Sequence, residues 1–111
     1  PQEMVIDIPE TFNYLLGLKV KKVKVRYNNT IEGRKYIFIL GERDRKNIVI
    51  IWREYDEKWK DEDYKKDKEF IRKELEGDWY PHIVYINGQT VLTNQHYEIK
   101  HIEPEFKKLI W

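Results

Sequence analysis

The chain contains no cysteine, which excludes disulfide bonds and thiolate chemistry. Absence of cysteine is typical of reducing compartments, so we expect a cytoplasmic protein. No apolar run approaches the ~20 residues of a membrane span and no signal-peptide pattern is present, so we expect no membrane partner. An excess of one charge sign is also missing, since 21 basic and 20 acidic residues give a net charge of +1. A dedicated nucleic-acid-binding domain usually carries a clear basic excess.

Charged residues are nevertheless abundant, at 37% of the chain. Lys, Glu and Ile dominate, as in heat-adapted (thermophile) proteins with many surface ion pairs, although a Lys-rich, AT-rich genome predicts the same bias. The length of 111 residues suits one small domain. Because the chain begins with Pro1 rather than Met, we expect residues 1–111 to be a single accessory domain, a fragment of a larger chain.

The first predicted element is a short helix that begins after Asp7. Asp7 and Glu10 have the spacing of a capping box, and Gly17 supplies a left-handed stop. The apolar face of this helix is made of Ile8, Phe12, Leu15 and Leu16.

Apolar alternation and apolar runs predict strands over 18–27, 34–42, 48–52, 82–86 and 97–102. In the first strand the alternation changes phase at Lys21 and Lys22, which predicts a β-bulge. Beyond the bulge the basic residues are expected on a solvated face, and Val23, Val25 and Tyr27 on the opposite face. The second and third strands are continuously apolar, which indicates burial on both faces.

A charged helix is predicted over 61–76, with Tyr64, Ile71 and Leu75 as its inner stripe, and a last helix opens at Pro104. Because a strand, this helix and another strand follow in sequence, a right-handed βαβ crossover is expected. The predicted fold class is α/β: a small mixed sheet, with an antiparallel hairpin extended by one βαβ unit and flanked by N- and C-terminal helices. A mostly antiparallel α+β domain is the alternative.

Four residues follow predicted parallel strands at the edge where open α/β sheets place ligand crevices. Arg53 could contact phosphate or carboxylate, and Gly88 allows close backbone approach. The competing interpretation is core packing and a simple turn. The crevice candidates are Trp52, Arg53, Asn87 and Gly88.

Basic residues cluster on the first predicted hairpin, where they could follow a DNA backbone in a sequence-independent, salt-sensitive way. An ordinary solvated face is the alternative. The DNA-contact candidates are Lys21, Lys22, Lys24, Arg26, Arg34 and Lys35.

Asp44 and the run Asp56-Glu57-Lys58 faintly match the carboxylate pattern of Mg²⁺-dependent nucleases. Asp44 is predicted in a turn and Asp56 beyond a strand end, so the nuclease interpretation is a remote alternative. No metal site is predicted from the three histidines, which lack metal-ligand spacing.

Large apolar side chains near exposed elements suggest a surface that docks another domain or subunit. Closure of the domain's own core is the alternative. The docking candidates are Trp59, Phe106, Ile110 and Trp111, with Tyr64 nearby.

Four blocks carry a family resemblance: Ile6–Leu18 (which contains Glu10–Leu18), Ile50–Arg53, Tyr85–Gly88 and Ile102–Leu109. In this order and spacing they resemble the C-terminal region of adenine-specific DNA methyltransferases of the type III restriction-modification (Mod-like) kind. The resemblance implies a parent that transfers a methyl group from S-adenosylmethionine to N6 of a flipped-out adenine. It spans nearly the whole chain.

The two motifs that perform this transfer in the family are missing from the chain. No Pro-Pro pair exists for the loop that holds the adenine, and no Gly-x-Gly exists for the turn that approaches the cofactor. We therefore expect no catalytic or cofactor-binding residue here, with S-adenosylmethionine and DNA bound by the parent. The expected role is docking or assembly with the catalytic domain, a second copy or a restriction subunit. A DNA-backbone-contacting module is the alternative.

Overall fold

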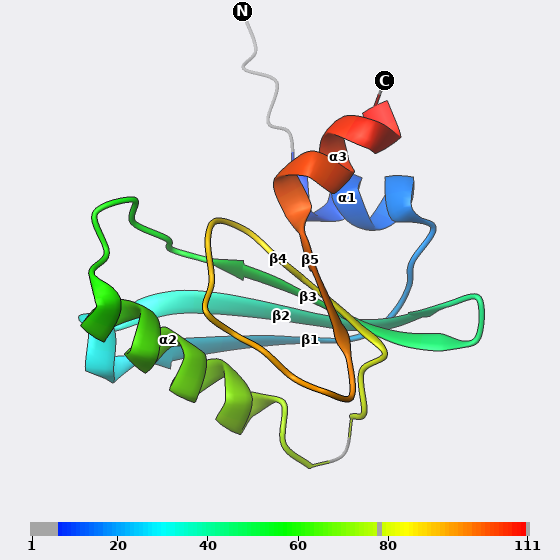
Figure 1. Ribbon diagram of the computed structural model, residues 1–111. Coiled ribbons are helices and arrows are strands. Elements are labelled where there is room, and N and C mark those ends of the chain that lie inside the picture. The colour runs from blue at the N-terminus through cyan, green and yellow to red at the C-terminus, as the bar shows by residue number, and fades with distance from the viewer. Residues whose placement is uncertain (1–6, 78, 111) are drawn as a thin grey trace, which may run out of the picture.

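Five strands form one mixed sheet, with α1 and α3 on one face and α2 on the other (Figure 1). The computed structural model describes residues 7–77 and 79–110. The elements are α1 (Ile8–Leu16), β1 (Lys19–Asn28), the 3₁₀ turn η1 (Asn29–Ile31), β2 (Arg34–Arg43), β3 (Lys46–Arg53), α2 (Asp61–Glu74), β4 (Ile83–Ile86), β5 (Glu98–His101) and α3 (Ile102–Ile110).

The strand order β1-β2-β3-β4-β5 confirms the predicted fold class. β1 pairs with β2 and β2 with β3 in antiparallel fashion, whereas β3 and β4 are parallel and are joined through α2. β5 adds a second parallel pair on β4, reached through a loop rather than a helix. Two of the four strand pairings are parallel, so the sheet is mixed.

The sheet separates two apolar cores, which explains why β2 and β3 are apolar without interruption. On the α2 side, Tyr36, Phe38 and Val49 pack with Ile71 of the helix. On the other side, Phe12 and Leu16 of α1 pack over Ile39, Ile50 and Tyr85, joined by Ile102 of α3. Alternate residues of the same strand thus serve opposite cores.

The Asp7 cap and the Gly17 stop predicted for α1 are confirmed. Asp7 Oδ1 accepts a hydrogen bond from the Glu10 backbone N–H at 3.0 Å, and Gly17 ends the helix at φ 71°. Ile8 is half exposed, however, so the buried face of the helix is shorter than predicted.

Within residues 7–77 and 79–110, no helix combines the length and apolar character needed to cross a membrane.

Candidate functional site

Arg53 lies in the interior, not in an open crevice as the sequence predicted. It ends β3 on the α2 side of the sheet, and its side chain is fully buried against Asp67 of α2. Arg53 Nε donates to Asp67 Oδ1 at 2.9 Å, and the two terminal nitrogens donate to the backbone carbonyls of Asn87 and Gln89. Each of the three guanidinium nitrogens donates a hydrogen bond within the domain, and the side chain is fully buried, so Arg53 holds the fold together and does not face a phosphate in solvent.

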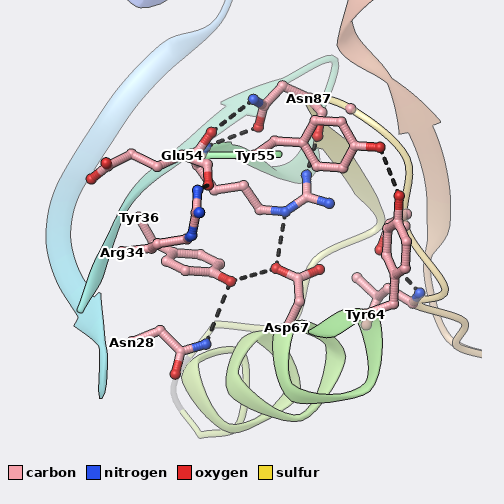
Figure 2. A network of polar contacts seen from close by, with 12 residues as sticks. Asn28, Arg34, Tyr36, Glu54, Tyr55, Tyr64, Asp67 and Asn87 are labelled. Carbon is pink, nitrogen blue, oxygen red and sulfur yellow. Dashed lines mark hydrogen bonds and ion pairs between the residues drawn. The ribbon is translucent and has the colours of Figure 1, made fainter. Parts of the chain in front are cut away.

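Asp67 is the centre of this buried network, which the sequence interpretation missed. Its Oδ1 also accepts from the Tyr36 hydroxyl at 2.5 Å, and Tyr36 lies between Asp67 and Asn28 (Figure 2). Burial raises the pKa of the Asp67 carboxyl, although Arg53 and Tyr36 oppose that rise. Burial and the neighbouring carboxylate likewise raise the pKa of Tyr36. The sequence does contain a signal that Asp67 is buried, because position 67 falls on the inner stripe of the helix between Tyr64 and Ile71.

The other crevice candidates also support the fold. Trp52 points to the opposite face of the sheet, where it packs edge-on against Phe12 with the ring centroids 6.0 Å apart. The Asn87 side chain accepts from the Arg53 backbone N–H and donates to the Arg53 carbonyl, both at 2.9 Å. Gly88 has φ 72° and lies directly on the Tyr55 ring. The competing interpretation, core packing and a turn, therefore describes these residues.

An open hollow of about 610 Å³ does lie at the C-terminal ends of the parallel strands, but of the crevice candidates only Gly88 lines it. Tyr55 and Tyr64 form one wall, and the hydrogen bond between their hydroxyls (2.7 Å), with burial, raises the pKa of Tyr64 to about 12. His101 and Glu103 contact the Gly88 backbone. Among the residues that the structure describes, no three metal-ligating side chains gather anywhere.

The carboxylates of the nuclease pattern are far apart. Asp44 lies in the β2–β3 turn and Asp56 beyond the far end of β3, whose eight residues separate them by roughly 25 Å. Asp56 instead accepts from the Lys58 backbone N–H at 2.8 Å and pairs with Arg34 at 3.5 Å. Asp44 and Asp56 therefore do not share a metal.

Most DNA-contact candidates are engaged with carboxylates of the domain itself. Lys24 and Arg26 both pair with Glu74 of α2, at 3.6 and 3.5 Å. Lys21 pairs with Glu42 at 3.7 Å, and Arg34 pairs with Asp56. Lys22 and Lys35 form no ion pair among the described residues.

These two remaining cations do not share a surface. Lys22 is opposite Leu40, whose side chain belongs to the α2-side core, whereas Lys35 is opposite Tyr27 on the other face. The hairpin therefore does not present a continuous unpaired basic surface on either face.

An apolar surface appears instead on the face of β1 that the lysines do not occupy. Val23 is 55% exposed, Val25 42% and Tyr27 59%. The bulge predicted at Lys21 and Lys22 is present as a register shift between Val20 and Lys22. Beyond it, Val23 and Val25 are opposite Ile39 and Ile37, on the same face as α1 and α3.

The two helices leave this part of the face uncovered. α1 and α3 pack over Ile39, Ile48 and Ile50, whereas Ile37 and Trp52 are only partly buried at the margin of that core. We call the resulting surface the hairpin strip; it consists of Val23, Val25, Tyr27, Ile37 and Trp52. It lies on three predicted strands, but alternation alone does not reveal how far the helices cover this face of the sheet.

The docking candidates from the sequence lie mostly in the domain's own packing. Trp59 is 9% exposed beneath Arg34 and Arg53, whose guanidinium groups lie 5.7 and 5.3 Å from its ring. Phe106 packs on Phe12 with ring centroids 5.4 Å apart. Ile110 is 60% exposed, and Trp111 lies outside the described residues. Trp59 and Phe106 thus close the cores, as the alternative interpretation proposed.

No family model, no curated protein and no solved structure matches this chain.

Proposed function

We propose that this chain is a non-catalytic accessory domain that docks onto another folded unit through the hairpin strip. The exposure of Val23, Val25 and Tyr27 on one sheet face is the observation that carries the proposal. Single exposed apolar residues are ordinary, but a contiguous group rimmed by charges is typical of protein interfaces. Tyr27 and the partly exposed Trp52 are residue types that dominate binding energy at such interfaces.

The sequence resemblance supplies the proposed partner. We propose a parent that resembles an adenine-specific, type III Mod-like DNA methyltransferase, with S-adenosylmethionine and DNA bound by its catalytic domain. The strip then docks against that catalytic domain; a second copy or a restriction subunit are the other partners that fit an assembly role. The absence of cysteine supports a cytoplasmic location for this assembly.

Ion pairing supports docking over the alternative of DNA contact. Glu42, Glu74 and Asp56 form ion pairs with four of the six candidate cations, Glu74 with two of them. A DNA-tracking surface needs cations that are free to replace the counterions of phosphates. Fluorescence anisotropy of a labelled duplex, at low and then physiological salt, separates the two functions: docking predicts no saturable binding at physiological salt.

The docking proposal is tested by the affinity of this chain for the catalytic domain of the parent, supplied as a separate polypeptide. Val25→Thr keeps the shape of the side chain but places a hydroxyl in the strip, and we expect a cost of ~1 kcal/mol, about a fivefold weaker affinity. Val91→Thr is the matched control, because Val91 is similarly exposed (47% against 42%) but lies in the β4–β5 loop. Equal affinities for the two variants would refute the strip as the docking surface.

A further inference from the structure

Among the residues that the structure describes, β1 is an edge strand of the sheet. It is ten residues long, and in the strand order it has β2 as its one neighbour. The outward backbone N–H and C=O groups of an edge strand are a template for another extended chain. The opposite edge, β5, has four residues and offers a much shorter template.

The two faces of β1 differ in chemistry, so each face would favour different side chains on a strand that pairs with it. Val23, Val25 and Tyr27 project on the strip side, and Lys22, Lys24 and Arg26 project on the α2 side. Residues that neighbour one another across two strands lie on the same face and interact directly. A sixth strand would therefore place alternate side chains beside three apolar residues and beside three cations.

The charge of β1 indicates which kind of strand could pair with it. Lys19–Asn28 contains five basic residues and no acidic residue. A second copy of β1 would set cations beside cations, which is unfavourable in a sheet, whereas an acidic strand would set opposite charges together. Glu42 and Glu74 show this preference within the domain, because both are carboxylates that already contact the basic side chains of β1.

Lysines on an edge strand also discourage non-specific pairing with other strands, and this role accounts for the basic residues of β1. It does not account for Val23, Val25 and Tyr27, because an edge that only repelled other strands would not expose three apolar side chains beside its free backbone groups.

We infer that β1 binds an extended polypeptide segment of alternating acidic and apolar residues, which adds to the sheet as a sixth strand. The apolar residues of the segment extend the hairpin strip. Its acidic residues lie beside Lys22, which has no ion pair among the described residues, and beside Lys24 and Arg26, which they share with Glu74. This inference rests on the proposed docking function and names the chemistry of the segment that docks. It is a β-strand addition, in which backbone hydrogen bonds give affinity and the alternating side chains give specificity.

The test uses the whole 111-residue chain, ¹⁵N-labelled, titrated with two synthetic peptides of about ten residues. One peptide alternates Glu with Val and the other alternates Lys with Val. We expect the acidic peptide to bind roughly tenfold more tightly and to slow amide hydrogen exchange within Lys19–Asn28. Lys22→Glu, at an exposed position without an ion pair among the described residues, should reduce that preference.

Three results would overturn the inference: equal binding of both peptides, amide changes located on α2 or α3 instead of β1, or slowed exchange in β1 caused by self-association without peptide. Failure here is distinguishable from failure of the docking proposal. If Val25→Thr weakens binding of the catalytic domain while neither peptide binds, the strip docks without strand addition. If the acidic peptide binds and Val25→Thr leaves the catalytic domain's affinity unchanged, the edge is a site and the proposed partner is wrong.

Discussion

Lys24 is more buried than its neighbour Val23, because Glu74 at the end of α2 and the Phe38 ring lie against the lysine. The Lys24 side chain is 17% exposed, where it pairs with Glu74 and lies 5.7 Å from the Phe38 ring, whereas Val23 is 55% exposed. Long lysine stems can cover apolar surface while the ammonium stays near water. This inversion produces the hairpin strip and underlies the proposed function.

Polar substitution in the strip should barely change stability. Val23→Thr removes a methyl group that already meets solvent, so we expect the free energy of unfolding to change by less than about 0.5 kcal/mol. Val49→Thr is the matched substitution in the core, where Val49 is fully buried, and it should cost ~1–3 kcal/mol because the hydroxyl has no partner. Urea unfolding of both variants measures the difference; a similar loss in Val23→Thr would show that the strip belongs to the core.

The buried Asp67–Arg53 pair should be essential for folding. Asp67→Ala leaves the Arg53 guanidinium buried without its carboxylate, and we expect a loss of ~3–5 kcal/mol. Glu69→Ala removes an exposed carboxylate from the same helix and should change stability by less than about 0.5 kcal/mol. Chemical denaturation followed by circular dichroism compares the two. Equal stabilities would contradict the structural role given to Asp67.

Burial of Asp67 also predicts a pH dependence. Because burial raises the pKa of this carboxyl above 3.8, the folded state binds the proton more tightly than the unfolded state. Wild type should therefore lose stability relative to Asp67→Asn as pH rises from about 3.8 through the raised pKa, and the difference should be constant above it. Denaturation midpoints of both proteins across this range measure the difference. A relative gain for wild type would mean that Arg53 dominates and lowers the pKa.

Two glycines with the same backbone conformation should respond differently to alanine. Gly17 and Gly88 have φ 71° and 72°, so alanine is strained at either position by ~1–2 kcal/mol. A Cβ at Gly17 meets nothing within 4 Å, whereas at Gly88 it would lie 2.6 Å from the Tyr55 ring. We expect Gly88→Ala to cost about 1–3 kcal/mol more than Gly17→Ala in thermal or urea unfolding. Equal costs would mean that the Tyr55 ring moves aside.

Much of the fold could be predicted from the sequence, since strands with continuous apolar runs must lie in the middle of a sheet. The end of α1 at Gly17 and the β-bulge at Lys21 and Lys22 could also be predicted, because each of these sequence patterns is typical of one structure. How far the helices cover the sheet could not be predicted. Alternation defines two faces, and the positions of α1 and α3 decide which part of their face stays exposed.

The site was harder to predict, because charged residues were interpreted as exposed. Arg53 follows an apolar run and Asp67 lies within a charged helix, so neither was assigned to the interior. Their burial depends on the packing of α2 against β3. A local sequence pattern does not predict this contact, because it joins two separate elements. For Trp59 and Phe106 the sequence leaves docking and core packing open, because it does not contain the contacts that bury them.

The most direct test of docking through the hairpin strip places a photo-crosslinking phenylalanine derivative at Tyr27 or, as a control, at Tyr80 in the proposed parent protein. Both tyrosines are well exposed (59% and 77%), but Tyr80 contacts Asn47 near the start of β3 and lies away from the strip. Docking through the hairpin strip predicts efficient crosslinking from position 27 to the polypeptide segment that carries the methyltransferase motifs, with little from position 80. Equal crosslinking from both positions, or none from position 27, would contradict docking through the hairpin strip.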